Sequence, residues 1–424
     1  KIDFTKKIEF LNSDAILKFG LFGSSKERDF SIAQFSVSSN YTSESDWDNY
    51  GGDPNQIFNP NNLIGPNNDK GTFVNPQTTI IQDANIFNAR QQNIAVYVSN
   101  EFNFSEKFKS IIGLRLEDYQ VFYTGENSQL GQVFNNENII SNINLFPSVN
   151  VIYNLKENKN LRLAYSLTTA RPSFKEASIA EIFDPLSNLF FIGNIDIRPT
   201  YIDNFDIRYE AFSENAQLFA ISAFYKNLTD PIEIAFVAAS FSNYKPLNLE
   251  TANVFGLEIE LRKDLSTLFS MLENWRINFN GSYIISDEKY SEDELKLRRL
   301  GLREGQTLGT SRPLQGQSPY LINAGVEYNN QEKGFQGGLF YNVQGKTLQV
   351  VGNGFYPDVY TMPFNSLNFN VIKQLKKNRT LTFKVTNLLN DKRESNFIGF
   401  NEEQRYFSLR HIGRTFSFNY AVRF

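Results

Sequence analysis

Large apolar side chains occupy every second position of the segment Phe416-Ser417-Phe418-Asn419-Tyr420-Ala421-Val422-Arg423-Phe424. Successive side chains of a β-strand point to opposite sides, so this segment would carry apolar residues on one face and small or polar residues on the other. A strand of this kind fits a wall with an apolar medium on one side and water on the other.

The same alternation recurs along the chain, for example in 161–168, 257–262 and 276–285. The alternating segments run for about 12–20 residues, whereas strands of globular proteins average about 5–6. A bilayer crossing takes about 9–11 tilted residues, and a soluble β-sandwich would show shorter strands with turns every ~8–12 residues. Length and alternation together predict an all-β fold, a transmembrane antiparallel β-barrel.

The composition excludes several other classes. The 424 residues include 40 Phe and 20 Tyr but no Cys and one His, with a formal net charge of -4. The mean hydropathy is -0.38, and no apolar run reaches the ~18 residues of a membrane helix. Without Cys the chain has no disulfide scaffold or thiol nucleophile, and its slight acidity argues against a nucleic-acid partner. The glycines form no nucleotide-binding motif, so we expect no cofactor.

The connections between the alternating segments are short and long in turn. Bacterial barrels have short periplasmic turns and long extracellular loops, so we expect the long segments, rich in Asn, Gly, Pro and Ser, on the outside. These segments are 40–88, 125–143, 173–196, 291–315 and 395–406. The pattern predicts about 15 strands, with 15–39 as one long strand bulged around Gly23-Ser24-Ser25. A barrel with both ends in the periplasm needs an even number, so we expect at least one strand before Lys1.

Four segments, in chain order, carry the patterns of a known family. Leu163-Ala164-Tyr165-Ser166 followed by Ala170-Arg171-Pro172-Ser173-Phe174 is the first, and Gly193 to Glu210 (GNIDIRPTYIDNFDIRYE) is the second. Val385 to Lys392 (VTNLLNDK) is the third, and the fourth is Phe424 with its preceding alternate aromatics. Together they resemble the C-terminal part of large TonB-dependent outer-membrane receptors. The second segment is similar to a family motif in which a loop re-enters the barrel, but it has Ile195 where Pro is usual and Thr200 where Glu is usual.

This resemblance implies that 1–424 is the C-terminal portion of a barrel of about 22 strands, with the first strands and the plug domain preceding Lys1. It implies TonB-dependent, energy-coupled uptake of a scarce nutrient (an iron chelate, vitamin, glycan or peptide) by a multi-pass protein of the bacterial outer membrane. The chain would supply barrel wall and outer loops and would not be an enzyme. The implied partners are outer-membrane lipid and lipopolysaccharide, the TonB complex through the plug region, and the barrel assembly machinery. A surface lipoprotein or a larger outer-membrane complex stays open as a further partner.

Three other functions stay open from the residues alone. A passive porin would be a closed, even-stranded barrel with a constricting loop. A non-transport scaffold or adhesin would dock its loops on partner proteins. A soluble β-sandwich or carbohydrate-binding module would need no lipid around it.

Two groups of residues are candidate functional positions. Aromatic side chains on the expected outer loops would hold a substrate by stacking, or would pack the loops onto one another; they are Trp47, Tyr50, Phe183, Phe190, Phe191 and Tyr244. The alternating residues of the last strand resemble the signal read by the barrel assembly machinery; they are Phe416, Phe418, Tyr420, Val422 and Phe424. An aromatic girdle at the membrane interface would need the same residues.

The sequence also contains charged residues and one His that are candidates for lining the barrel, binding a metal or catalysis. Some are expected on the inner face, against the plug or in a hydrated wall: Arg115, Glu117, Arg162, Glu258, Glu260, Arg262 and Arg276. Glu44, Asp46, Asp48 and Asp53 offer hard oxygen ligands for calcium but lack EF-hand spacing, which favours a solvated acidic loop. His411 has no Cys to pair with and lies on an expected strand, so we predict no catalytic residue and no metal site.

Overall fold

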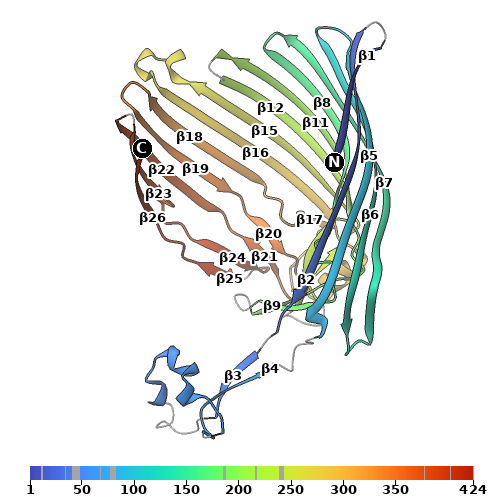
Figure 1. Cartoon of the computed structure of the whole chain (residues 1–424), viewed down its shortest axis with the longest axis vertical. Helices are drawn as coiled ribbons and strands as arrows, with labels where there is room; N and C mark the ends of the chain where they lie inside the picture. Colours follow the sequence, from blue (N-terminus) through green and yellow to red (C-terminus); the bar gives the residue numbers. More distant parts are fainter. Residues whose placement is uncertain are drawn as a thin grey trace.

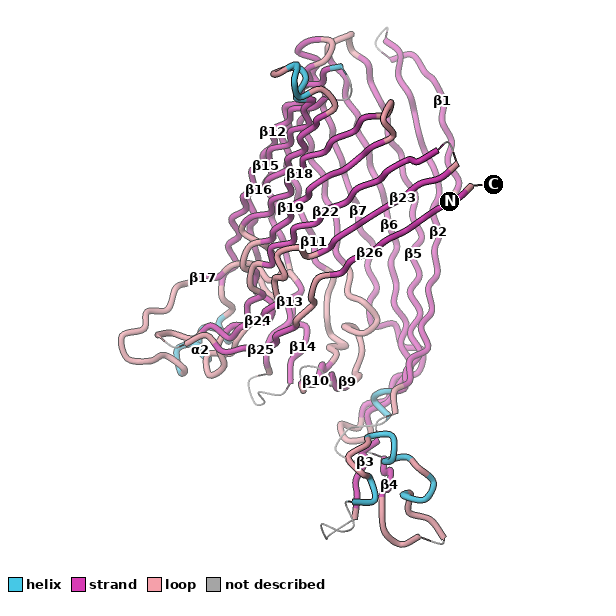
Figure 2. The backbone as a smooth tube through the Cα atoms, turned by 90° about the vertical axis from the view of Figure 1, so that its left-hand side faces the viewer, coloured by secondary structure: helices cyan, strands magenta, loops and turns pink. Residues whose placement is uncertain are grey.

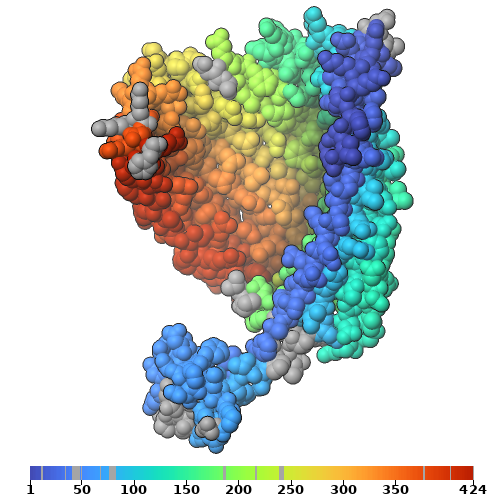
Figure 3. Space-filling view, in the orientation of Figure 1, coloured from blue at the N-terminus to red at the C-terminus, as the bar shows by residue number. Residues whose placement is uncertain are grey.

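A single large antiparallel sheet dominates the computed structural model, which describes residues 1–10, 13–33, 35–40, 48–66, 68–76, 83–184, 188–214, 217–237, 243–376, 378–401 and 403–423. The sheet has 16 strands, of which short β17 (Ser311–Arg312) pairs only with β16 at its outer end, and the others follow one another in chain order. The wall strands curve around a hollowed side, with blue β1 and red β26 at its two edges (Figures 1 and 3). The wall strands are β1 (Ile2–Phe10), β2 (Ser13–Ser31), β5 (Ile86–Asn103), β6 (Phe108–Asn127), β7 (Gln132–Lys156), β8 (Lys159–Ala170), β11 (Thr200–Ser213), β12 (Gln217–Thr229), β15 (Thr251–Asp264), β16 (Trp275–Lys289), β18 (Tyr320–Asn330), β19 (Phe335–Gln344), β22 (Phe364–Lys376), β23 (Arg379–Thr386) and β26 (Thr415–Val422).

The wall has two chemically different faces, as the alternation predicts. Ile94, Ile143 and Phe418 are 63%, 74% and 71% exposed, and similar apolar side chains cover the same face of every neighbouring strand. The opposite face carries Arg162, whose register partners on the next three strands are Arg208, Ser222 and Glu258. An apolar outer band of this extent requires lipid around it.

The first and last wall strands do not pair with each other among the described residues. Each wall strand is antiparallel to the next, and an odd number of such strands leaves β1 and β26 pointing in the same direction. An antiparallel ladder between them is therefore geometrically impossible. No described helix is long and apolar enough to cross a membrane.

Smaller sheets lie at the wall's outer end, shown at the bottom of Figures 1 and 2. One has the order β13 (Ile232–Phe236), β14 (Asn243–Asn248), β10 (Leu189–Ile192), β9 (Glu181–Asp184), and another has β20 (Thr347–Val350), β21 (Asp358–Thr361), β24 (Arg393–Ile398), β25 (Arg405–Arg410). We call these two sheets, with the helix α2 (Glu292–Leu300) and β17, the cap. The hairpin of β3 (Phe35–Ser39) and β4 (Thr72–Pro76) projects away from the wall as an arm (Figure 2). Short 3-10 helices are η1 (Asp48–Tyr50), η2 (Pro54–Phe58), η3 (Pro60–Asn62), η4 (Asp83–Asn85), η6 (Leu265–Thr267) and η7 (Ser270–Leu272).

The expected number of about 15 wall strands is confirmed, while two boundaries differ from expectation. Residues 125–143 are not a long loop, because β6 and β7 continue as a paired hairpin as far as the Asn127↔Gln132 pair. The segment 15–39 is not one strand: β2 pairs with β5 in unbroken register through Gly23, and β3 leaves the wall for the arm. The expected loops 40–88, 173–196, 291–315 and 395–406 hold the arm and much of the cap.

Candidate functional site at the mouth of the barrel

The connection between β8 and β11 folds back onto the inner face of the wall. Tyr119 and Tyr123 of β6, which share their face with Arg115, are 1% and 0% exposed because Ala177 and Ile179 of this connection pack on them. The Ile179 backbone N–H donates to Tyr123 Oη at 3.4 Å. We call residues 171–199 the re-entrant segment, and its position confirms the expectation drawn from the Gly193–Glu210 motif.

Two residues of the recognised motifs anchor the re-entrant segment. The Arg171 guanidinium donates to the Glu117 carboxylate and lies 4.0 Å from the centre of the Tyr119 ring. A Cβ on Gly193 would lie 2.3 Å from the Ser178 carbonyl oxygen, closer than any side chain tolerates. Glycine is therefore required where the returning part of the segment passes close to the backbone of its outgoing part.

Several other inward-facing charges form ion pairs along the wall, and Glu258 accepts a hydrogen bond from Ser222 Oγ at 3.4 Å. Glu210 binds Arg162 at 2.5 Å and Arg208 at 3.1 Å, and Arg208 reaches Glu260 at 2.9 Å. Arg276 binds Asp264 at 2.7 Å. The predicted inward charges therefore share one hydrated face with their partners, and Glu260, Arg262 and Arg276 line a broad groove on it.

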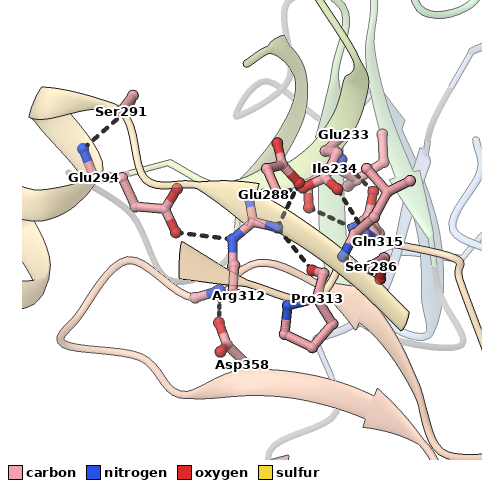
Figure 4. A network of polar contacts seen from close by, with 12 residues as sticks. Glu233, Ile234, Ser286, Glu288, Ser291, Glu294, Arg312, Pro313, Gln315 and Asp358 are labelled. Atoms are coloured by element: carbon pink, nitrogen blue, oxygen red, sulfur yellow. Dashed lines mark hydrogen bonds and ion pairs between the residues drawn. The ribbon is translucent and has the colours of Figure 1, made fainter. Parts of the chain in front are cut away.

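An ionic cluster fixes the centre of the cap (Figure 4). Arg312, 3% exposed, lies 2.7 Å from Glu233, 3.0 Å from Glu288 and 3.0 Å from Glu294. Burial alone would lower the pKa of Arg312, but these carboxylates raise it above its ordinary value. The cluster joins β13, β16 and α2 through one side chain.

A second arginine and an amide extend the cluster. Arg298 of α2 binds Asp358 of β21 at 2.7 Å and Glu294 at 2.8 Å. The Gln315 amide donates to the carbonyls of Ile234 at 2.8 Å and Gln349 at 2.7 Å. The two cap sheets are thus tied to each other and to the wall by buried polar contacts, which are costly to leave unmade.

Four of the six predicted substrate aromatics lie together in the cap. The Phe183 and Phe190 rings contact each other in a tilted arrangement, 5.0 Å between centres, and Phe191 meets Tyr244 edge-on at 5.7 Å. Tyr50 lies apart from them on the arm, 8% exposed, with its hydroxyl 2.6 Å from Thr72 Oγ1. These contacts are those of the packing interpretation, and contact with a substrate stays a prediction. Trp47 lies outside the described residues.

Asx side chains hold the turn from Asn387 to Asp391 at the end of β23. Asn387, with φ 54°, donates from its amide to the carbonyls of Asp391 at 3.0 Å and Gly413 at 2.9 Å. Burial would raise the pKa of Asp391, but hydrogen bonds from Asn365 and Lys392 lower it below its ordinary value. The turn locks β23 to the start of β26.

The remaining candidates have simpler surroundings. Phe416, Phe418 and Tyr420 are exposed on the outer face of β26, Val422 is half-buried, and Phe424 lies outside the described residues. Asp53 caps η2, while Glu44 and Asp46 fall outside the described part of the chain, in which no group of three or more acidic or His side chains is placed to hold a metal ion. His411 is exposed.

Sequence reasoning missed the ionic cluster and α2. The helix had a readable signal, because Ser291 caps it by accepting from the Glu294 N–H at 3.2 Å and acidic residues fill its first turn. The cluster had none, since its members are far apart in the sequence.

Wall, re-entrant segment and cap together define a large part of an outer-membrane-type β-barrel, with one connection folded onto the inner face of the wall and two small sheets at its outer end. The family model described as TonB dependent receptor-like, beta-barrel, matches residues 5–388, and the chain belongs to this family. No curated protein matches the sequence.

Solved structures of similar fold come from several bacteria. The siderophore receptor PiuA from Acinetobacter baumannii has a TM-score of 0.62 and 11% identity, covering 99% of this chain and 54% of its own. The ferric-catecholate import receptor Fiu from Escherichia coli K12 has 0.59 and 12%, covering 100% and 54%. The ferric yersiniabactin uptake receptor FyuA from Yersinia pestis has 0.59 and 12%, covering 100% and 53%. At such identities the likeness shows the fold, and the chain spans about half the length of these receptors.

Proposed function

We propose that this chain is the C-terminal part of the wall, with the outer loops, of an outer-membrane receptor that imports an iron chelate in a TonB-dependent manner. The observation that carries the proposal is the ordered structure at the outer end of the wall: the re-entrant segment packs on the inner face, and the cap is held by the Arg312 cluster. A passive pore works by staying open, whereas a receptor that binds a scarce solute needs shaped outer loops. The cap fits the second requirement.

The similar structures support the choice of solute. Their descriptions name import or uptake of ferric catecholate and ferric yersiniabactin, and binding of enterobactin by the Pseudomonas aeruginosa receptor PfeA. Because this chain spans about half of such receptors, we place the plug and the TonB contact in the part of the receptor that it does not include.

The aromatic residues of the cap take part in this proposal. Phe183 and Phe190 would contact the solute from one face of their sheet and Phe191 and Tyr244 from the other, and Tyr50 and Trp47 would contribute from the loop 40–88. On the outer face, Phe416, Phe418 and Tyr420 would contact lipid and, with Val422 and Phe424, present the assembly signal.

Uptake in living cells tests the function. The full-length receptor is expressed in bacteria that lack their own iron-chelate receptors, with and without tonB, and 55Fe uptake is measured with catecholate, hydroxamate and hydroxycarboxylate chelates. We expect uptake of at least one class, lost in the tonB-null cells. Equal uptake in both strains would instead identify a passive channel, and no uptake of any class would reject iron chelates.

A further inference from the structure

The β24–β25 hairpin places two arginines directly opposite each other. Arg393 and Arg410 are register partners, so their side chains leave the same face of the hairpin. Like charges at such positions repel and destabilise a ladder. Neither guanidinium forms an ion pair with a carboxylate in the part of the chain that the structure describes, whereas Arg208, Arg298 and Arg312 in the wall and cap each bind at least one at 2.9 Å or less.

Both arginines line one small cavity of about 280 Å³ between the hairpin and the outer ends of β19 and β22. Neutral hydrogen-bonding side chains also line the cavity: Asn342, Gln344, Gln349, Thr361, Ser395 and Ser408. Glu394 also borders the cavity, but it alternates with Arg393 and Ser395 along β24 and so points to the other face of the strand. The cavity is therefore cationic, with amide and hydroxyl groups around its charges.

Packing orients one of the two guanidiniums. Arg393 lies over the Phe364 ring, 4.9 Å from the ring centre. Stacking occupies the flat face of a guanidinium and leaves its N–H edge free, which is the edge that binds carboxylate or phosphate oxygens in pairs. Ser395 and Ser408, register partners next to the arginines, add hydroxyl groups on the same face.

The cavity belongs to the inner side of the barrel. Asn342 of β19 lines both this cavity and the inward groove that contains Glu260, Arg262 and Arg276. A lipid head group outside the wall cannot reach that side, whereas a solute in the lumen can. The volume suits one anionic arm of a solute rather than a whole ligand, since sites for drug-sized molecules are about 300–1,000 Å³.

We propose that Arg393 and Arg410 form an anion-binding subsite that holds a carboxylate or similar oxyanion of the imported solute. The subsite rests on the proposed function only in that its solute is imported, because binding of the anion does not depend on transport. Binding would explain why Arg393 and Arg410 face each other without a carboxylate partner, because the bound oxyanion would neutralise the repulsion between them.

Binding is tested on the full-length receptor in detergent micelles, with succinate as the probe and saturation-transfer NMR as the readout. Succinamide, of the same shape but neutral, is the ligand control. The variants are Arg393→Gln, Arg410→Gln and the double variant, with Arg405→Gln as the matched control, because Arg405 lies on the same hairpin but does not line the cavity. Charge-assisted bonds of this kind predict at least a tenfold weaker succinate binding for each single variant.

The outcomes separate the subsite from the transport function. Succinate binding by the wild type and by Arg405→Gln, lost in the double variant and absent for succinamide, supports the subsite. No succinate binding by the wild type, or equal binding by the double variant, overturns it and leaves TonB-dependent uptake to be judged by the 55Fe assay. If the double variant loses succinate but transports carboxylate-bearing chelates with an unchanged half-saturating concentration, the anion site is not part of the solute path and the proposal fails.

Discussion

Replacing Arg312 by Met should open the cap without unfolding the wall. The guanidinium contacts three carboxylates, and the side chains of Glu233 and Glu288 are 2% and 0% exposed. Met has a similar length but no charge, so the variant leaves these carboxylates buried without a cation. Breaking a buried ion pair from one side costs roughly 3–5 kcal/mol, which corresponds to an increase of about 10²- to 10⁴-fold in the open population of the cap.

Hydrogen–deuterium exchange measures this opening directly. In Arg312→Met, amides of α2 and of β17 should exchange faster by that factor, while amides in the middle of β15 and β16 should keep their rates. Arg299→Met is the matched control, because Arg299 is exposed on the same helix and its loss removes the same charge. Adding Glu288→Gln to Arg312→Met should restore part of the protection, since one buried charge is then removed.

The pH dependence of the variant follows from the same charges. Carboxylates that are buried without a cation have pKa values raised above those in the open state, so their protonation favours closure. Protection in Arg312→Met should therefore be lost as pH rises and recovered as it falls. Wild-type exchange in α2 for Arg312→Met at neutral pH, or equal acceleration in Arg299→Met, would refute this account of the cluster.

Three further changes test the re-entrant segment and the β23 turn. Arg171→Met leaves Glu117 with Arg115 as its partner. The docking of 171–199 should therefore weaken by less than the cap does in Arg312→Met, by about 1.5–3 kcal/mol. Amides of 174–197 should exchange faster while β6 keeps its protection, and unchanged exchange would show that Arg171 does not anchor the segment. Gly193→Ala places a Cβ against the Ser178 carbonyl, so the same amides should lose protection and 55Fe uptake should fall. Gly23→Ala, at a position with open space and no positive φ, should leave the re-entrant segment docked. Asn387→Ala loses two donated hydrogen bonds and the residue type suited to φ 54°. We expect its free energy of unfolding, measured by thermal unfolding, to be about 1–3 kcal/mol lower. Asn387→Asp should be intermediate because it keeps the acceptor for the Asp391 N–H, and a wild-type melting temperature for Asn387→Ala would contradict the role of this turn.

The wall could be predicted from sequence because lipid imposes a strict rule on it. Every outward position of a membrane strand must be apolar, and this produced the alternation in 161–168 and 276–285 and the strand count that the sheet confirms. The outer part of β7, Gln132–Ile139, carries consecutive polar residues and so presents polar side chains on both faces. Its Asn135, Asn136 and Asn138 therefore carry no alternation, and the segment looked like a loop.

The cap could not be predicted because its strands are short and its contacts are distant in the sequence. β9, β10, β20 and β21 have four residues each, too few for a period to be visible. Glu233 and Arg312 form an ion pair although β14, β15 and β16 separate them in the sequence. The family resemblance supplied the re-entrant segment through Arg171 and Gly193, yet it gave no sign of the cluster or of the opposed arginines.

Pairings join the cap into one unit from the opposed arginines to the re-entrant segment. β25 pairs with β24, β24 with β21 and β21 with β20, and a bridge from Ala235 to Val351 then reaches the sheet of β13, β14, β10 and β9. Elements that share ladders and a core open together, whereas β3 and β4 pair only with each other among the described strands of the arm and wall. A solute that binds only the closed cap must therefore bind more weakly when the cap is opened anywhere, in proportion to the closed population. Arg312 lines no part of the anion-binding subsite, yet Arg312→Met should weaken succinate binding. Arg299→Met should leave that binding unchanged. Equal succinate affinities for the two variants would mean that the hairpin of Arg393 and Arg410 moves independently of the ionic cluster.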